Sequence, residues 1–346
     1  MYKKSLIKIF FYFIFVTLLL LGMNYLVDPY GYNSREGKFV KNLTMFNKPN
    51  ITNSRLQSDG YYYLIGSSRM ARVDPNLIED ITGKATHNVK VDGATFLENF
   101  LLASKIKKKD SHFIYSFDVF SLNSFRQTFK EVQGRSEIYK NEFEKGVFFT
   151  KYFNSDITIR SLQHLIKHFK GEKKDKQYLE ENSRLSSFSL ENALNESGVL
   201  NNRNQSNFSN FKGYSLDEVA NLAQLGTKDD IFILFPKYYQ YYAMFSKHQK
   251  IEEEYFSALR ALVKNTKAQV WSFYGINNIT KSEANFIDNG WHFKPQISNI
   301  MFNQIFKSNT ATLNNNSGVL LTEENIDNYL LSLKDDNNSN FIMDSI

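Results

Sequence analysis

The sequence predicts an α/β protein with a five-stranded parallel sheet, helices on both faces of the sheet, and one transmembrane helix ahead of it. Short apolar runs alternate with stretches of helical periodicity, which is the pattern that parallel sheets produce. A basic start and a long apolar run precede the first strand candidate. The chain has 346 residues, which one large domain with insertions accounts for.

The N-terminal segment has the features of a membrane anchor. Residues 1–8 contain three lysines, and residues 9–27 are almost continuously apolar, close to the ~20 residues that a helix needs to cross a bilayer. Basic residues hold their end in the cytoplasm, so we expect a single-pass protein of the inner (cytoplasmic) membrane with its domain on the periplasmic or extracellular side. A cleaved signal peptide is the alternative, because the most apolar core, 9–21, is short. Bulky residues and no Ala-x-Ala-like site follow that core, which favours an uncleaved anchor.

Five strand candidates follow the anchor. Each is short, rich in aromatic or β-branched residues and bounded by turn residues. They are 61–65, 86–91, 113–117, 231–235 and 269–274. Helical patterns lie between them, most clearly at 96–106 and 255–267. We therefore expect one extracytoplasmic domain over 28–334.

An insertion around 120–228 separates the third and fourth strand candidates. It holds an apolar helical stretch at 157–169 and a polar run, 171–213, rich in Lys, Asn and Ser. Such a run buries little surface, so we expect a mobile or partly disordered loop. It is either a lid over an acceptor glycan or, more commonly for such segments, a surface insertion without a binding role. Residues 335–346 are expected to form a disordered tail.

The composition excludes several classes of function. The chain has no Cys, so it has no disulfide framework and no thiolate metal or redox site. The net charge is +6 with dispersed lysines, and no basic run is interleaved with base-stacking aromatics, so nucleic acid is not an expected partner. No cofactor and no metal ion are expected.

The first strand candidate ends at Gly66, Ser67 and Ser68, which suggests a nucleophile. Glycine permits a sharp turn, and the carboxyl edge of an open α/β sheet is where ligands bind. A helical pattern over 73–81, with Asp74 and Pro75 as cap and first turn, would leave backbone N–H groups near Ser68. Ser67 is expected to point back toward the sheet or cap the turn. The alternative is an ordinary strand-ending turn.

A possible partner for Ser68 lies far along the chain. Asp288 precedes His292 in a loop ahead of an apolar helical pattern at 297–305. A serine becomes a nucleophile when an imidazole takes its proton and a carboxylate orients that imidazole. Ser68, Asp288 and His292 supply these three groups. Taken alone, a histidine in such a loop is more often a surface residue.

Several segments share the order and spacing of a known family. They are Leu64-Ile-Gly-Ser-Ser-Arg69, Asn88-Val-Lys-Val-Asp-Gly-Ala-Thr95, 24–31, 73–75, 117–120, 273–280, 288–292 and 318–327. The chain thereby resembles the SGNH/GDSL hydrolase superfamily. It is most similar to the membrane-anchored SGNH-like proteins that accompany membrane-bound O-acyltransferases, relatives of the D-alanyl transfer proteins of teichoic acid synthesis.

The resemblance implies an SGNH (flavodoxin-like) fold and acyl-ester chemistry on a cell-envelope polysaccharide. Ser68 would attack the ester, His292 would act as base and then acid, and Asp288 would orient His292. The backbone amides of Ser68 and Gly93 would form the oxyanion hole, and the alternative for Gly93 is a plain turn. The resemblance further implies O-acyl (acetyl) transfer to a sugar, with a membrane-bound O-acyltransferase as partner. Water as acceptor would give an esterase.

The chain departs from the family pattern at three places, and the departures at Asp288 and Asp118 favour the alternative of a catalytically degenerate scaffold in a glycan assembly complex. The first block reads Gly-Ser-Ser rather than Gly-Asp-Ser. Asp288 precedes His292 by four positions rather than three, so either Gly290 loops out or Asn289 takes the orienting place. The third block supplies Asp118 where the family has an Asn for the oxyanion hole. A carboxylate there would repel an oxyanion unless it is protonated or turned aside.

Overall fold

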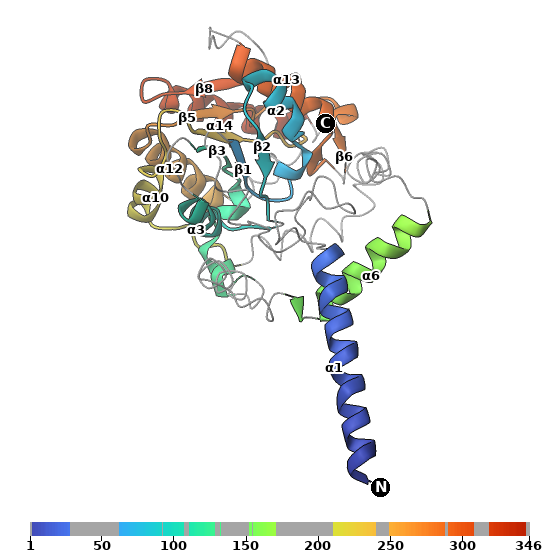
Figure 1. Ribbon diagram of the computed structural model, residues 1–346. Helices are drawn as coiled ribbons and strands as arrows, with labels where there is room; N and C mark the ends of the chain where they lie inside the picture. Colours follow the sequence, from blue (N-terminus) through green and yellow to red (C-terminus); the bar gives the residue numbers. More distant parts are fainter. Residues whose placement is uncertain are drawn as a thin grey trace.

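A computed structural model describes 2–27, 62–91, 93–106, 111–128, 132, 152–153, 155–170, 210–239, 249–287, 290–307 and 318–343. Helix α1 (Tyr2–Val27) extends away from an α/β unit that is built around one sheet (Figure 1). The polar run expected to be a mobile loop lies almost entirely outside these residues.

The sheet has six strands, one more than the sequence predicts. Their order is β2-β1-β3-β4-β5-β8, and the first five are parallel. The sixth, β8, pairs antiparallel with β5, which corrects the expectation of a purely parallel five-stranded sheet. The strands are β1 (Tyr62–Ile65), β2 (Thr86–Asn88), β3 (His112–Ser116), β4 (Ile231–Leu234), β5 (Gln269–Ser272) and β8 (Val319–Leu321).

Helices cover both faces of the sheet, as expected. One face packs against α3 (Phe96–Ile106), α10 (Leu216–Ala223), α12 (Gln249–Asn265) and α14 (Ile326–Met343). The other packs against α2 (Pro75–Thr82), α13 (Pro295–Lys307) and a hairpin of β6 (Phe286–Ile287) and β7 (His292–Phe293).

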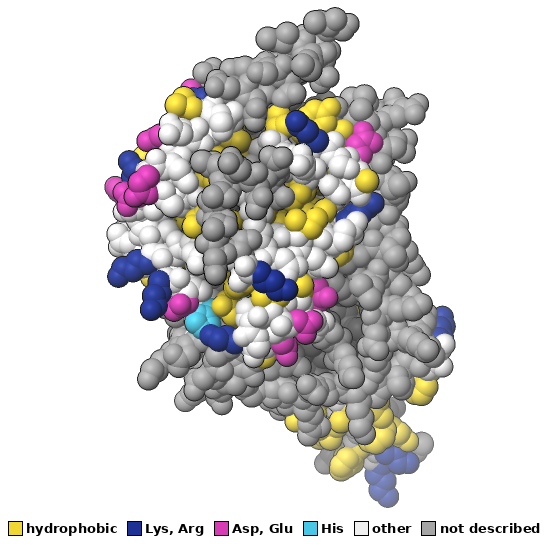
Figure 2. Space-filling view, turned by 90° about the horizontal axis from the view of Figure 1, so that it is seen from above, with side chains coloured by type: hydrophobic (Ala, Val, Ile, Leu, Met, Phe, Trp, Pro, Cys, Tyr) yellow, Lys and Arg dark blue, Asp and Glu magenta, His cyan; other side chains and the backbone are white. Residues whose placement is uncertain are grey.

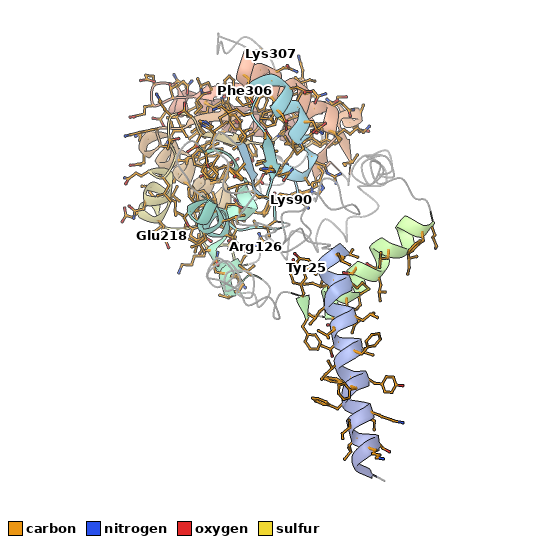
Figure 3. All side chains as sticks on the ribbon, in the orientation of Figure 1. Tyr25, Lys90, Arg126, Glu218, Phe306 and Lys307 are labelled. Carbon is orange, nitrogen blue, oxygen red and sulfur yellow. The ribbon has the colours of Figure 1, made fainter. Side chains whose placement is uncertain are left out.

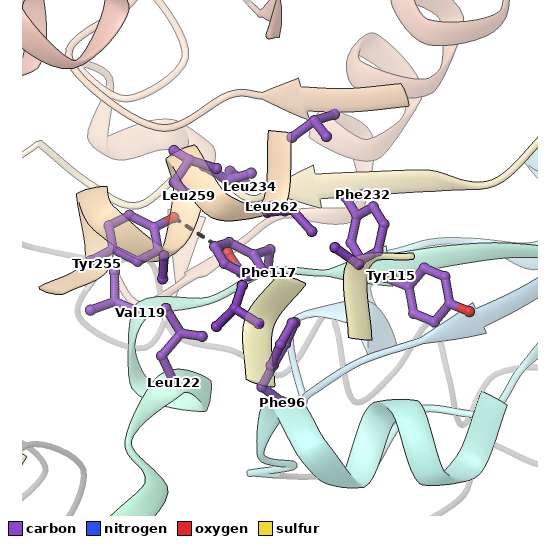
Figure 4. Packing of buried hydrophobic residues seen from close by; sticks show 14 of the residues in the cluster. Phe96, Tyr115, Phe117, Val119, Leu122, Phe232, Leu234, Tyr255, Leu259 and Leu262 are labelled. Carbon is purple, nitrogen blue, oxygen red and sulfur yellow. Dashed lines mark hydrogen bonds between the residues drawn. The ribbon is translucent and has the colours of Figure 1, made fainter. Parts of the chain in front are cut away.

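The two cores arise from the alternation of side chains along the strands. In β1, Tyr63 belongs to the core under α3 and α12, whereas Leu64 belongs to the core under α13. The first of these cores is strongly aromatic: the rings of Tyr115 and Phe232 are stacked with centroids 4.8 Å apart. The Tyr255 hydroxyl donates to the Phe117 carbonyl at 3.4 Å (Figure 4).

The segment after β1 differs locally from the prediction. A 3₁₀ turn, η2 (Met70–Arg72), follows the serines directly, and α2 begins only at Pro75. The Asp74 side chain caps α2 by accepting from the Asn76 amide at 2.9 Å, as the sequence predicts. The Ala71 amide of η2 donates to the Ser68 carbonyl at 3.2 Å, so η2 rather than α2 follows Ser68 directly.

Helix α14 runs to Met343, across the stretch from 335 that the sequence assigns to a disordered tail. Its first half is fixed by packing, with Leu330 and Leu333 buried. Extending an existing helix costs much less free energy than nucleating a new one. This explains why the polar residues that follow Leu333 continue the helix.

The apolar N-terminal segment forms a helix long enough to span a membrane, over Lys4–Val27 with mean hydropathy 2.4. Its side chains project outward on all sides (Figure 3). The helical stretch of the insertion is α6 (Ser155–Phe169), which packs against the C-terminal part of α1. On the face of the molecule in Figure 2, charged side chains of both signs are interspersed among the described residues.

Candidate functional site

The candidate site lies at the carboxyl edge of the sheet, at the end of β1. Strand β2 lies on one side of β1 and β3 on the other, so the direction in which strands are added to the sheet reverses at β1. Loops diverge at such a point, and open α/β sheets bind ligands there. Three strand ends contribute: Ser67, Ser68 and Arg69 follow β1, Asp118 follows β3, and Lys237 follows β4.

The structure brings Ser68 and His292 together. Ser68 Oγ lies 2.9 Å from His292 Nε2, although 224 positions separate the residues. Ser68 is partly exposed and His292 is 9% exposed, so the pair borders solvent. With its proton on Nδ1, the imidazole accepts the serine hydroxyl proton through Nε2, the arrangement that general-base activation requires.

His292 lies on a strand of the β6–β7 hairpin rather than in an irregular loop, which corrects the prediction. It pairs with Ile287 across the hairpin. Two further backbone bonds hold the hairpin: Lys294 N donates to Asn285 O at 2.8 Å and Tyr238 N donates to Gly290 O at 3.1 Å. The imidazole is thus carried by paired backbone that is tied to the segment after β4. The short pairing could not be recognised from the sequence because each strand has two residues.

Ser67 and Arg69 hold the carboxylate that the sequence analysis regarded as an obstacle. Asp118 Oδ1 accepts from Arg69 Nη1 at 2.6 Å, and Asp118 Oδ2 accepts from Ser67 Oγ at 3.0 Å. Arg69 is 1% exposed and Asp118 is 2% exposed, so this is a buried, charge-assisted pair. Both carboxylate oxygens are engaged, and the negative charge of Asp118 is balanced by Arg69.

Arg69 also connects this ion pair to the histidine hairpin. Its Nε and Nη2 each lie 3.3 Å from the carbonyl oxygen of Trp291, the residue before His292. Nη2 donates in addition to the Pro236 carbonyl at 3.0 Å. One guanidinium therefore joins the ends of β1, β3 and β4 to the backbone that carries His292.

A buried lysine lies beside the same hairpin. Lys237 is 1% exposed, and its Nζ lies 4.7 Å from the centre of the Trp291 ring. Burial lowers the pKa of Lys237 well below its ordinary value because it disfavours the charged form. The positive charge of Arg69 lowers this pKa further, and the negative charge of Asp118 opposes both effects.

Gly66 is required for space rather than for an unusual backbone angle. A Cβ at this position would contact Ser116 Oγ and come within 2.8 Å of Ser116 Cβ. Ser116 Oγ in turn accepts from the Ser67 amide at 3.3 Å. The close approach of β1 and β3 at this point places the two serines at the edge of the sheet.

Gly93, the second expected oxyanion-hole residue, lies in the loop after β2. Its φ of +65° is in the left-handed region, which glycine adopts without strain. Its carbonyl accepts from Arg126 Nη2 at 2.8 Å (Arg126 is labelled in Figure 3). The Val91 amide donates to the Gly66 carbonyl at 2.8 Å, so the loops that carry Gly93 and Ser68 leave the sheet side by side.

Asp288, the expected orienting acid, and Asn289, its alternative, lie outside the described residues. The sequence analysis missed Arg69 and Lys237. A signal for Arg69 was present, because a charged residue directly after a buried strand and turn is unusual unless it is paired. In the part of the chain that the structure describes, no cluster of three or more His, Asp or Glu side chains could hold a metal ion.

Comparisons with known proteins add no assignment. No protein-family model matches the chain, and no curated protein matches its sequence.

Proposed function

We propose that this protein carries out acyl-ester chemistry with Ser68 as nucleophile and His292 as general base. The observation that carries the proposal is the 2.9 Å approach of Ser68 Oγ to His292 Nε2 at the carboxyl edge of the sheet. The order of the five parallel strands, β2-β1-β3-β4-β5, is that of flavodoxin-like sheets and supports the resemblance to SGNH hydrolases.

The chemistry follows the logic of serine hydrolases. His292 Nε2 takes the Ser68 proton as Oγ attacks the acyl carbonyl, and the same nitrogen returns the proton to the departing alcohol. The amides of Ser68 and Gly93 would stabilise the oxyanion. Asp288 would hold Nδ1 of the imidazole in the required tautomer.

The Arg69–Asp118 pair weakens the argument for a degenerate scaffold. A carboxylate after β3 would destabilise an oxyanion by charge repulsion if the carboxylate were not paired with a cation. Asp118 instead accepts bonds from Arg69 and Ser67 with both oxygens, so its negative charge is compensated by a buried guanidinium.

We further propose a sugar hydroxyl as acceptor, which makes the protein an O-acyltransferase for a cell-envelope polysaccharide. Helix α1 is long and apolar enough to anchor the domain in a membrane, next to which a membrane-bound O-acyltransferase would deliver the acyl group. Water as acceptor would make it an esterase.

The experiment is active-site labelling of the full chain in detergent with a fluorophosphonate probe, together with hydrolysis of p-nitrophenyl acetate. We expect Ser68→Ala to abolish labelling and to lower hydrolysis by roughly 10³-fold or more, as losing a triad member does. Ser67→Ala is the matched control and should retain most of both signals, because the Ser67 hydroxyl bonds to Asp118 rather than to His292. Asp288→Asn should be intermediate.

Circular dichroism spectra of the variants must match that of the wild type. Equal labelling of wild type and Ser68→Ala would exclude Ser68 as the nucleophile. If the folded wild type is not labelled, and if Ser68→Ala does not affect glycan acylation in cells, the protein would act as a scaffold rather than as an enzyme.

A further inference from the structure

Helix α6 is attached to the C-terminal part of α1 by specific contacts. The Asn24 side-chain amide donates to the Tyr152 carbonyl at 2.7 Å and to Thr158 Oγ1 at 2.9 Å. The rings of Tyr25 and Tyr152 meet edge to face with centroids 5.5 Å apart, and Figure 3 places Tyr25 at the end of α1 next to α6. Leu165 of α6 and Gly22 of α1 line an apolar hollow between the two helices.

Helix α6 carries more apolar surface than this contact uses. Ile157 and Ser161 are buried, at 1% and 0% exposed. Four other apolar residues are 45% to 83% exposed and recur at helical spacing: Ile159, Leu162, Ile166 and Phe169. At ~100° per residue they form one stripe next to the side that faces α1. This stripe is called the α6 stripe below, and it belongs to a helix that packs against α1, whose own apolar side chains are largely exposed.

The depth of the contact on α1 corresponds to a membrane surface. The span Lys4–Val27 has 24 residues, or about 36 Å at ~1.5 Å per residue, slightly more than the ~30 Å hydrocarbon core. Asn24 and Tyr25, which contact Tyr152 and Thr158, lie in its last third. Tyrosines are enriched where a transmembrane helix leaves the hydrocarbon core, and Tyr25 lies near that end of α1.

We propose that α6 is an interfacial helix whose stripe is buried in the lipid of the bilayer that α1 crosses. The occupant is lipid because the α6 segment is attached to α1 at Asn24 and Tyr25, the end of the apolar span, where that helix reaches the headgroups. Helix α6 leaves α1 obliquely (Figure 1), and a tilt of α1 of the usual ~20° brings it closer to the membrane plane. Together the two helices would hold the chain at the surface and restrict its rotation about α1. The proposal requires α1 to be inserted and does not depend on the reaction at Ser68.

The chain has no Cys, so single cysteines can be labelled without background. We would attach an environment-sensitive nitrobenzoxadiazole fluorophore to Ile166→Cys in the full chain, reconstituted into phosphatidylcholine vesicles with or without brominated acyl chains. Phe13→Cys, in the middle of α1, reports insertion. Leu216→Cys, on α10 of the α/β unit, is the matched control because Leu216 is 51% exposed and Ile166 is 53% exposed.

We expect bromolipid to quench the fluorophore at 166 to an extent comparable with that at 13 and several-fold more than at 216. Iodide in the aqueous phase should quench the fluorophore at 216 and spare the one at 166. Leu162→Cys should reproduce the result at 166. Iodide quenching at 166 and 162 would overturn the proposal. Shielding of both positions from iodide and from bromolipid would also overturn it, because it would mean that protein covers the stripe. Absence of bromolipid quenching at 13 would also overturn it.

Discussion

Ser67 and Ser68 are adjacent hydroxyls with opposite surroundings. Ser67 is 1% exposed and bonds to Asp118, whereas Ser68 is partly exposed and meets His292. Both serines lie in the turn that follows β1, where the Met70 and Ala71 amides donate to their carbonyls, and their hydroxyls have different partners. Arg69 then turns inward to balance Asp118. Three consecutive residues thus supply a candidate nucleophile, a buried hydrogen bond and a buried cation.

At the residue scale, Lys237 should make stability depend on pH. Its pKa is lowered in the folded state, mainly by burial. At pH values between this lowered pKa and the ordinary value of 10.5, the lysine is protonated in the unfolded chain and neutral in the folded chain. The unfolding free energy should therefore rise with pH across that window. Lys237→Met should lose this rise and be more stable than the wild type at neutral pH, by on the order of 1 kcal/mol.

Thermal unfolding of the full chain in detergent, followed by circular dichroism at a series of alkaline pH values, measures both effects. Lys228→Met is the control because Lys228 is exposed, and its pH dependence should match that of the wild type. A Lys237→Met variant that keeps the wild-type slope would show that another group titrates.

At the scale of elements, a tyrosine hydroxyl bonds α14 to the end of β5. Tyr329 Oη lies 2.6 Å from Ser272 Oγ and donates to the Tyr274 carbonyl at 2.9 Å. Leu333, one turn further along α14, packs against Gly275. Because β8 pairs with β5 from the edge and α14 follows β8, these contacts fix how the C-terminal part of the chain closes the sheet.

Tyr329→Phe should destabilise the fold by about 1–3 kcal/mol, because it removes buried hydrogen bonds to Ser272 Oγ and the Tyr274 carbonyl. Leu331→Ala, on the same helix but 58% exposed, should change stability by no more than about 0.5 kcal/mol. Denaturant unfolding of the full chain in a non-denaturing detergent compares the two. Equal effects of both substitutions would argue against a specific junction between α14 and β5.

At the scale of the whole molecule, the chain consists of an exposed apolar helix and an α/β unit. Only 6% of the most apolar window of α1 is buried inside the protein, which is far less than in a helix that serves as the core of a soluble fold. Because lysines lie at its N-terminal end, we expect that end to stay in the cytoplasm.

Protease added to intact spheroplasts should therefore digest the α/β unit while cytoplasmic marker proteins survive. The mature protein should also keep its N-terminus, as N-terminal sequencing of the membrane fraction would show. Full protection of the chain would contradict the orientation, and loss of the first residues would instead indicate a cleaved signal peptide.

Much of the architecture was predictable from the sequence because it depends on local patterns. All five predicted strands are present and parallel, since short apolar runs between amphipathic helices have few other ways to bury themselves. Helix α3 has the predicted bounds, and Asp74 caps α2. The antiparallel β8 was not predicted because three residues carry too little periodicity to distinguish a strand from a loop.

The amino-acid sequence by itself determined the apolar N-terminal helix, the alternation of strands and helices, and the identities of Ser68 and His292 as candidates. Only the tertiary structure decided that these two side chains lie within hydrogen-bonding distance, and that Arg69 compensates Asp118. The physical reason is that periodicity records which face of an element is buried, a property of neighbouring residues. A contact between residues 224 positions apart depends instead on the order of the strands and on the loops that their carboxyl ends bring together.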